Sequence, residues 1–427
     1  MSFAYFAYGA DLWLPQLRSR CPSAQVVDVA RLEDWEVVCD KPSDDGSSKF
    51  NIRSRPGSRV EGVVYDIEDG EIDRLEQAVL GYRPIHVELE EGWTLTFAYD
   101  GVPSGRPAYD WYVSMAVAGA RQHGIEAGAL QVDAVPDPLV AGVTPAGRDD
   151  LDRVTAILSA GLAAGGDRYF IHPGDYGWWV FHDDPRNPDH FSTWLQGDDG
   201  FVTIDSIEPY EINVFARPGI DRFPLIQWAQ RRLDNRGEVG WVSDDDHELI
   251  DALRTEGYAP RYAFRSYRWD LGSDLPIPDL PQGWTLRPVQ GEAEADSRRR
   301  ASHAAFESTM EPTMHLQRYL DLMRSPVYVP ERDLVAVSPE GTIAAFMIWW
   351  GDSESGIAQI EPFGTHPDFH RMGIGRALIL HGLAEMRRAG MTSARVCTDD
   401  DRPATGFYEG VGFEDVGRLR WWGQTGT

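Results

Sequence analysis

Hydrophobic residues in the last third of the chain recur first with the period of β-strands and then with that of an α-helix. The predicted elements are a helix at 292–306, strands at 334–337, 342–350 and 357–363, a helix at 373–389, a strand at 394–397 and a helix at 403–410. The first two strands form a hairpin across Pro339-Glu340-Gly341. A strand that runs through a glycine turn into a long helix is typical of an α/β cofactor-binding layout.

Strands dominate the first third of the chain. The pattern predicts strands at 3–8, 62–67, 85–89 and 94–99, with helices at 72–80 and 110–123. Small residues follow one another along the second helix at Ser114, Ala116, Ala118 and Ala120. This mixture indicates an α+β domain or a small β-barrel with helices.

The middle third repeats the element order of the last third. It predicts a helix at 149–162, strands at 177–181 and 210–215, a helix at 225–233 and a closing segment at 249–258. Two stretches rich in proline and glycine, 132–147 and 271–283, separate the thirds. We therefore expect a multidomain α+β and α/β protein, with domains at 1–135, 143–271 and 283–427.

The net charge of −28 over 427 residues narrows the classes of partner. It argues against nucleic acid and against an anionic membrane surface, because both require clustered cations. It suits a soluble protein, and it also suits one that binds a cationic substrate. We therefore expect neither nucleic acid nor a membrane as a partner.

The three cysteines, Cys21, Cys39 and Cys397, form no CxxC pair, which excludes a thiolate zinc site and a disulfide scaffold. No signal peptide and no apolar run of about 18 residues is present, so we expect a cytoplasmic protein. The eleven histidines contain no HExxH motif. His366 and His370 are separated by Pro367, which prevents a helical pair of ligands, so we expect no metal.

The glycine turn of the last third, HRMGIGR at 370–376, is the most informative stretch. Gly373 and Gly375 allow the backbone to approach a ligand closely, and the first helical turn offers N–H groups to a phosphate. Such a pair of glycines is equally typical of a plain strand-to-helix turn. The residues that follow decide between these interpretations.

The sequence DRPATGFYEGVGF at 401–413 follows about thirty residues later. With the glycine turn, it resembles the GNAT acetyltransferase superfamily over about Trp284 to Trp422. The resemblance implies acetyl-CoA as co-substrate and Tyr408 as the general acid beside the CoA sulfur. It implies cofactor binding by Phe363, Gly364, Thr365, His370, Arg371, Met372, Gly373, Ile374, Gly375, Arg376 and Asp401. Here His370 replaces the usual Arg or Gln, and Asp401 replaces the usual Asn.

Amine acetylation requires a proton acceptor. A primary amine with a pKa near 10.4 is mostly protonated at pH 7, and removing its proton costs about 4.6 kcal/mol. Glu361 is the candidate base, acting directly or through a water, because it lies on the predicted strand beside the cofactor. A structural carboxylate bonded to nearby backbone is the alternative role for Glu361.

The middle third resembles the N-terminal half of a tandem GNAT protein. It lacks the residues that the last third offers for cofactor binding and catalysis. It contains no GxG pair, Pro224 stands near its helix start, and Leu253 stands where Tyr408 stands in the last third. We interpret it as a degenerate module that packs against the active one and shapes the substrate cleft.

The first third resembles the γ-glutamylcyclotransferase family over residues 3–130. YFAYGADL at 5–12 matches the YGSNL loop, and short matches continue in order to 119–124. The resemblance implies that Tyr8, Gly9, Ala10, Asp11 and Leu12 bind the glutamyl end of a γ-glutamyl compound. It also implies Glu76 as the acid/base of cyclisation. Ala10 and Asp11 replace the family's Ser and Asn, and Asp11 is expected to repel a substrate carboxylate.

Taken together, these features predict a GNAT N-acetyltransferase that acts on a primary amine of a small molecule, with a cationic acceptor as one choice. Two alternatives remain open. In the first alternative the protein is bifunctional, with γ-glutamyl cyclotransferase activity in the first domain as well. In the second it is a non-catalytic protein that senses acetyl-CoA or a γ-glutamyl compound.

Overall fold

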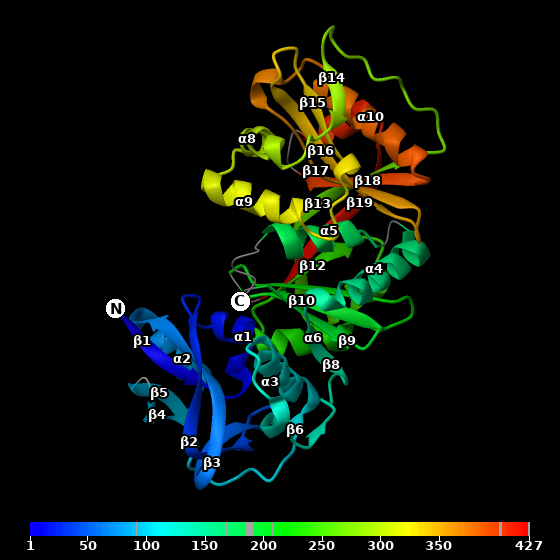
Figure 1. Cartoon of the computed structure of the whole chain (residues 1–427). Helices are drawn as coiled ribbons and strands as arrows, with labels where there is room; N and C mark the ends of the chain where they lie inside the picture. The colour runs from blue at the N-terminus through cyan, green and yellow to red at the C-terminus, as the bar shows by residue number, and fades with distance from the viewer. Residues whose placement is uncertain (91, 167–168, 184–190, 207, 401–403, 426–427) are drawn as a thin grey trace. The chain divides into compact units, whose positions relative to one another are not determined.

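The computed structural model describes residues 1–427 except 91, 167–168, 184–190, 207, 401–403 and 426–427 (Figure 1). The described chain divides into two compact units, each built from three segments. The N-terminal unit comprises 1–147, 188–214 and 224–237, and the C-terminal unit comprises 148–187, 215–223 and 238–427. The chain therefore passes more than once between the two units, and segments that are adjacent in sequence can belong to different units.

The N-terminal unit contains a five-stranded sheet in the order β2-β3-β1-β5-β4. Its strands are β1 (Ser2–Ala7), β2 (Gln25–Pro42), β3 (Ser48–Glu68), β4 (Arg83–Leu89) and β5 (Gly92–Ala98). β1 is antiparallel to β3 and parallel to β5. The outer strands β2 and β4 share no ladder in the described residues, so this hydrogen-bonding pattern leaves the sheet open and does not include the closed barrel that we expected.

Helix α3 (Asp110–Gln122) packs closely on the turn that follows β1. That turn contains η1 (Ala10–Leu12) and leads into α1 (Leu14–Arg18). A Cβ added to Gly119 would lie 2.3 Å from the Trp13 backbone nitrogen, so only glycine permits this approach. Gly119 thus allows the helix to pack directly against the YGADL turn. The remaining elements of this region are α2 (Ile72–Ala78), η2 (Asp69–Glu71), η3 (Ala127–Leu130), β6 (Ala108–Tyr109) and β7 (Ala134–Val135).

A second group of strands belongs to the N-terminal unit, in the order β11-β10-β9-β8. The elements are β8 (Val143–Ala146), β9 (Phe191–Gln196), β10 (Gly200–Asp205), β11 (Glu211–Ala216, in this unit up to Val214) and α6 (Phe223–Arg232). Trp194 of β9 lies edge-on to Trp13 at 4.8 Å and to Trp228 of α6 at 5.0 Å. These buried indoles join residues from all three segments of the unit.

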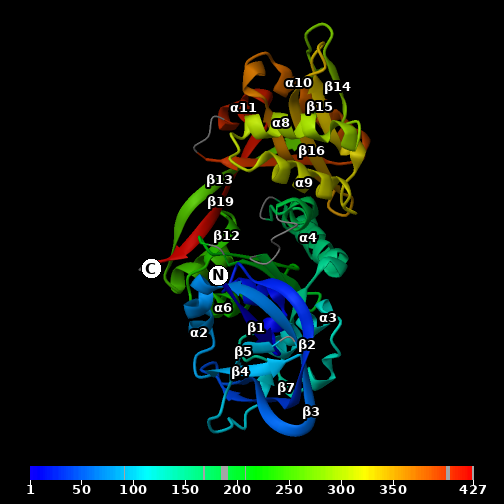
Figure 2. The same ribbon diagram turned by 60° about the vertical axis from the view of Figure 1, so that its left-hand side comes forward.

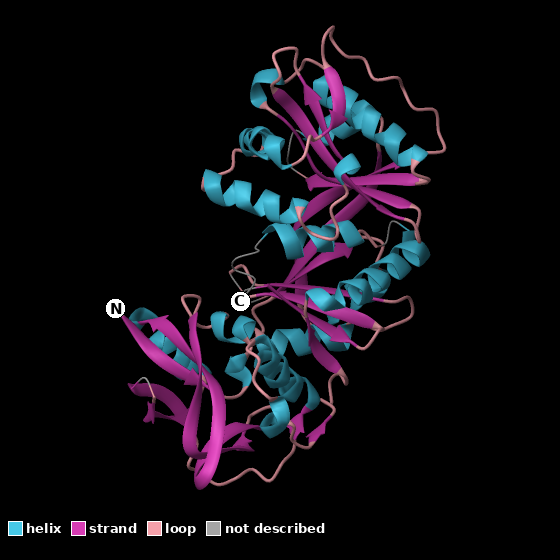
Figure 3. Cartoon of the chain, in the orientation of Figure 1, coloured by secondary structure: helices cyan, strands magenta, loops and turns pink. Residues whose placement is uncertain are grey.

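The C-terminal unit contains strands in the order β14-β15-β16-β17-β18-β13-β19-β12. They are β14 (Thr285–Pro288), β15 (Asp333–Val337), β16 (Ile343–Asp352), β17 (Ile357–Thr365), β18 (Ser393–Asp399), β13 (Tyr258–Asp270), β19 (Glu414–Gln424) and β12 (Glu238–Ser243). Its helices are α4 (Leu151–Gly165), α5 (Pro173–Trp178), α7 (His247–Thr255), α8 (Ala295–Ala305), α9 (Pro312–Met323), α10 (Ile374–Arg388) and α11 (Ala404–Val411) (Figure 3).

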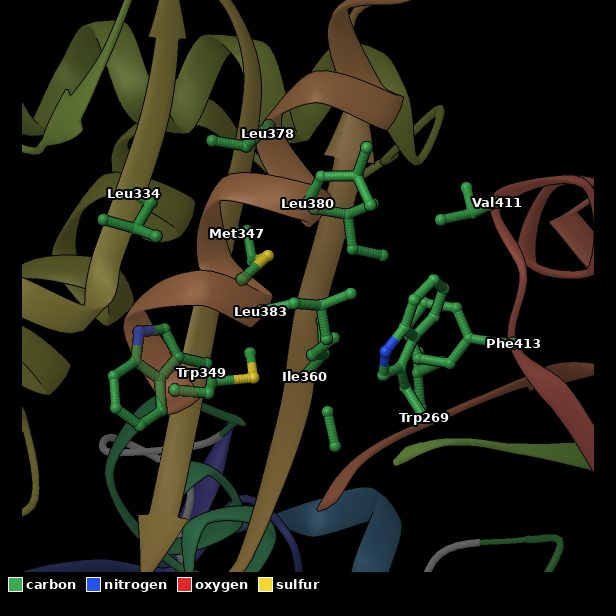
Figure 4. Close-up of a cluster of buried hydrophobic side chains, with 14 of the residues drawn as sticks. Trp269, Leu334, Met347, Trp349, Ile360, Leu378, Leu380, Leu383, Val411 and Phe413 are labelled. Atoms are coloured by element: carbon green, nitrogen blue, oxygen red, sulfur yellow. The ribbon is translucent and has the colours of Figure 1, made fainter. Parts of the chain in front are cut away.

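Helices cover both faces of the central strands. Alternate residues of a strand face opposite sides of a sheet. Leu334 and Met347 pack with α10, whereas Val335 and Phe346 pack with α8. Figure 4 shows Leu378, Leu380 and Leu383 of α10 over Met347 and Ile360 of the sheet. This core fixes the start of α10 beside the end of β17.

Strand β13 lies between β18 and β19 and is antiparallel to both (Figure 2). Its residues Phe264–Asp270 pair with Asp399–Ser393 of β18. β19 in turn pairs with β12 on its other edge. Residues on both sides of the proline-rich 271–283 loop therefore build one sheet, an arrangement that the loop's composition does not encode.

The prediction of a strand at 177–181 is wrong. Residues 173–178 form α5, and 179–183 continue as a π-helical turn. The cause is a capping box, because the His172 ring accepts the Gly174 N–H at 2.9 Å and Asp175 accepts the His172 N–H at 2.9 Å. With Pro173 at the first helical position, this cap starts a helix whose apolar residues pack against α9.

Candidate active site

Strands β17 and β18 run parallel for a short distance and then separate. Their ladder runs only from the pair Ile357 and Ser393 to the pair Gln359 and Arg395. β17 nevertheless continues to Thr365 and β18 to Asp399. The separated edge of β17 can therefore offer backbone hydrogen bonds to an extended ligand.

A register shift between β16 and β17 marks the point of separation. Met347 pairs with Phe363, and Trp349 pairs with Ile360, so the shift falls at Glu361 and Pro362. Such irregularities bend a strand and redirect its side chains. Beyond the shift, Glu361, Phe363 and Thr365 are partly exposed, whereas the residues between them are buried.

The predicted pantetheine segment is held from both sides. Phe363 stacks on Phe407 of α11 with ring centroids 5.4 Å apart. A Cβ on Gly364 would lie 2.5 Å from the Phe346 ring, so glycine is required against the core. Thr365 borders the following turn, because its carbonyl contacts the His370 ring at 2.9 Å.

The turn before α10 has the geometry of an anion site. Gly373 is the N-cap residue with a φ of +80°, and Arg371 also has a positive φ of 62°. The first helical hydrogen bond runs from Ala377 N–H to the Gly373 carbonyl at 2.9 Å. The N–H groups of Ile374, Gly375 and Arg376 thus have no intrahelical acceptor and suit a pyrophosphate.

The other predicted residues of this turn have distinct positions. His370 forms a hydrogen bond within the turn, and Met372 is exposed. Gly375 lies so close to β17 that a Cβ there would be 2.6 Å from Thr365 Oγ1. Asp401 lies outside the described residues.

Tyr408 of α11 is buried among aromatic rings. Its ring centroid lies 5.5 Å from that of Tyr267 and 6.3 Å from that of Phe363. Burial raises the pKa of Tyr408 well above its usual range, and the charge of Glu361 raises it further. The hydroxyl therefore keeps its proton, as a general acid must before it reacts.

The charge of Glu361, the predicted base, reaches Tyr408. This charge acts on the pKa of both Tyr408 and Cys397, which places the carboxylate near the two strands where they separate. The Trp350 indole N–H donates to the Glu361 carbonyl at 2.7 Å and fixes the backbone there. A buried hydroxyl and a carboxylate thus influence each other in one region of the C-terminal unit.

Sequence reasoning missed a second carboxyl in this region, that of Asp175. Burial raises the pKa of Asp175 to about 7, although the His172 N–H donates to it. Its charge, like that of Glu361, raises the pKa of Cys397 on β18. The His-Pro-Gly-Asp sequence at 172–175 carries the signal, because it is a capping box at the start of a helix.

The YGADL turn lines a cavity of about 210 Å³ in the N-terminal unit. Tyr8, Gly9, Ala10 and Asp11 line it, whereas Leu12 is fully buried outside the lining. Tyr5 donates to Asp11 at 2.8 Å, and Arg20 pairs with Asp11 at 3.1 Å. The predicted repulsion of a carboxylate by Asp11 is thus offset by a cation.

The predicted acid/base of the N-terminal domain lies elsewhere. Glu76 is exposed on α2 and is not among the residues that line the cavity. Ala78, Val79 and Leu80, which follow it, do line the cavity. The described structure therefore does not bring Glu76 to the YGADL turn.

Two further findings concern the described residues alone. They contain no group of three or more His, Cys, Asp or Glu side chains arranged to hold a metal ion. They also contain no helix that is long and apolar enough to cross a membrane.

Comparison with known proteins gives the two regions their families. A family model described as the acetyltransferase (GNAT) family matches residues 299–413. Mycothiol acetyltransferase of Salinispora arenicola is 28% identical over 295 residues, covering 65% of this chain and 95% of that protein. The enzyme of the same name from Segniliparus rotundus is 25% identical over 242 residues, covering 52% and 91%. γ-Glutamylcyclotransferase of Bos taurus is 32% identical over 141 residues, covering 29% of this chain and 73% of that protein.

The chain belongs to the γ-glutamylcyclotransferase family and is a fusion of such a domain with a tandem GNAT N-acetyltransferase. GNAT acetyltransferases use acetyl-CoA as co-substrate, and the backbone geometry at the start of α10 fits its pyrophosphate. Both resemblances drawn from the sequence are thereby confirmed.

Replacing either turn glycine should weaken acetyl-CoA binding. Gly373→Ala forces a left-handed backbone on alanine, and Gly375→Ala places a methyl group against Thr365. We expect the KM for acetyl-CoA to rise at least tenfold in each variant. Gly410→Ala on exposed α11, where nothing lies within 4 Å, is the matched control and should leave the KM unchanged. An unchanged KM in both turn variants would contradict this assignment.

The buried Asp175 should make stability depend on pH. Its pKa is about 7 in the fold and near 3.8 when unfolded, so its contribution to stability is fully present below pH 4 and is lost as pH rises to 7. Asp175→Asn removes this dependence and retains an acceptor for His172 N–H. We therefore expect the Tm of the variant, relative to wild type, to be higher at pH 8 than at pH 5. Between pH 5 and pH 8 the difference corresponds to about 2.7 kcal/mol, because the two pH units from pH 5 to a pKa of about 7 are each worth about 1.36 kcal/mol.

Exposed Asp274→Asn is the control for this comparison and should shift Tm equally at both pH values. A relative Tm of Asp175→Asn that is the same at pH 5 and pH 8 would show that the carboxyl is ionised in the fold.

Proposed function

We propose that the C-terminal unit transfers the acetyl group of acetyl-CoA to a primary amine of a small molecule, with Glu361 as base and Tyr408 as acid. The observation that supports this assignment is the burial of the Tyr408 hydroxyl, on whose pKa the charge of Glu361 acts, in the unit where β17 and β18 separate. A donor and an acceptor of protons thus share the region that an extended cofactor arm can enter.

The proposed reaction follows from these positions. Glu361 removes a proton from the ammonium group, directly or through a water, and the free amine attacks the thioester carbonyl. A new C–N bond forms, and the C–S bond then breaks with its electron pair on sulfur. Tyr408 donates its proton to the leaving CoA thiolate, and the second proton that leaves the nitrogen as the neutral amide forms restores the Tyr408 hydroxyl, directly or through a water. General acid–base groups of this kind typically contribute about 10²–10⁴-fold to rate.

The chain's own backbone would hold the co-substrate. We assign the pyrophosphate to the N–H groups at the start of α10 and the pantetheine arm to the free edge of β17. The residues proposed to bind it are Phe363, Gly364, Thr365, His370, Arg371, Met372, Gly373, Ile374, Gly375, Arg376 and Asp401. A charge-assisted hydrogen bond from each free N–H would contribute on the order of 1.5–3 kcal/mol.

For the acceptor we propose an amine of the kind that the relatives' names suggest, the unacetylated amine form of mycothiol. The carboxylate of Glu361 supports an acceptor that arrives as a cation. The middle third, which lacks the GxG turn, would support this site rather than bind a second acetyl-CoA. All three cysteines are free thiols, in keeping with the expected cytoplasmic location.

Tyr408→Phe removes the proposed acid while keeping the aromatic packing. We expect kcat for CoA thiol release to fall more than tenfold across an amine panel that contains the mycothiol amine and polyamines. Tyr262→Phe, an exposed tyrosine of the same unit, should retain wild-type kcat. Thiol release by Tyr408→Phe at the wild-type rate would show that Tyr408 is not the general acid.

Glu361→Gln keeps the size of the side chain and removes the proposed base. With saturating acceptor, kcat should fall at least tenfold, while the KM for acetyl-CoA stays within about twofold. Exposed Glu354→Gln, in the turn between β16 and β17, is the matched control. If kcat is unaffected and only stability falls, Glu361 is a structural carboxylate.

A further inference from the structure

The cavity of the N-terminal unit carries an excess of positive charge. Four cationic side chains line it, those of Arg20, Lys41, Lys49 and Arg232, against the single carboxylate of Asp11. The lining of the cavity is thus positively charged, whereas the chain as a whole has a net charge of −28. A concave site whose polar groups share one sign selects ligands of the opposite sign.

Two of the four cations are already neutralised. Arg20 pairs with Asp11 at 3.1 Å, and Lys49 pairs with Asp45 at 2.6 Å. Lys41 and Arg232 have no carboxylate partner among the residues that the structure describes. Lys41 lies over the Tyr82 ring at 5.2 Å. Two unpaired cations therefore face the cavity.

Arg232 belongs to α6, far along the chain from the YGADL turn, yet its guanidinium is held rigidly in the cavity wall. It lies 4.4 Å from the ring centroid of Trp194 and 5.1 Å from that of Trp111. One N–H donates to Gln16 Oε1. Burial lowers the pKa of Arg232 to about 9, which shows how poorly the surroundings compensate its charge.

A guanidinium presents five N–H donors in a planar fork that matches a carboxylate. In the described residues, Arg232 uses only Nη2, toward Gln16 and the Met115 sulfur. Its remaining donors are thus available to a ligand. The indole rings already hold the guanidinium in one orientation, so binding of an anion would cost little additional side-chain entropy.

The family resemblance already implies that this cavity takes the glutamyl end of a γ-glutamyl compound. We propose that Arg232, which α6 supplies from outside the cyclotransferase-like region, anchors the carboxylate of a small ligand there, with Lys41 as the second cation. The aromatic wall suits the carbon chain of such a ligand, and it includes Tyr5, Tyr8, Phe50, Tyr82, Phe97 and Tyr112. The volume of about 210 Å³ admits a small organic molecule, since a single water needs only about 10–15 Å³ by the same measure. Because Arg232 follows the cyclotransferase-like region in sequence, this binding site is a property of the fusion.

Calorimetric titration of the full-length protein tests the proposal. The probes are glutarate, L-glutamate and γ-glutamylalanine, with glutaramide as the uncharged match to glutarate. We expect at least one carboxylate to bind with a Kd below about 10 mM and at least tenfold tighter than glutaramide. Failure of all three carboxylates to bind, or equal binding of glutaramide, would overturn the proposal.

Substitutions of the lining cations test which side chain binds the carboxylate of the ligand. Arg232→Gln should weaken carboxylate binding at least tenfold, and Lys41→Gln should weaken it by a smaller factor. Arg236→Gln, an exposed arginine just beyond α6 that does not line the cavity, should bind as wild type does. Wild-type affinity in Arg232→Gln would overturn the role of Arg232. If that variant fails to fold, Arg232→Lys replaces it, because it keeps the charge and loses the fork, and undiminished affinity there would equally overturn the role.

Discussion

The separation of β17 from β18 is the constraint on which the acetyltransferase site depends. Parallel strands normally satisfy each other's backbone groups along their full length. Here pairing stops after Gln359 and Arg395, and a register shift at Glu361 turns the rest of β17 away. The same shift leaves a backbone edge open to an extended ligand, presents Glu361 beside Tyr408, and carries the chain into the glycine turn before α10. Closing the ladder would remove all three at once.

A strand that loses one partner must be supported on its other edge, and β13 provides that support. It pairs with β18 over seven residues, including the part of β18 that β17 has left. β13 comes from the middle third, and β19 then pairs with β12 of the same third. The middle third lacks the GxG turn, but it supplies β13 and β12 to the sheet that contains β17 and β18.

The sequence predicts what is local and misses what is brought together by packing. Helical spacing from Ile374 onward locates α10, and the glycine turn with the Tyr408 segment identifies the family, because these signals lie within a few residues of one another. The apolar run at 177–181 predicts a strand but forms the end of α5 and the π-helical turn, because a short apolar run does not distinguish strand from helix and the His172 cap decides. The insertion of β13, the burial of Asp175 and the entry of Arg232 into the cavity are contacts between distant segments. No periodicity records such contacts.

The net charge of the chain does not predict the charge of its individual sites. A net charge of −28 suggests a single preference for cations, yet the two sites differ in sign. Around Tyr408, burial and the charge of Glu361 raise the pKa of the Tyr408 hydroxyl and of the Cys397 thiol. In the N-terminal cavity, four cations face a single lining carboxylate, and the charge of Arg232 is poorly compensated. At physiological ionic strength the Debye length is about 8 Å, so distant surface charge contributes little to either site. The ligand preference of each site is therefore set by the few groups that line it, and one acidic chain can hold a site for an amine and a site for an anion.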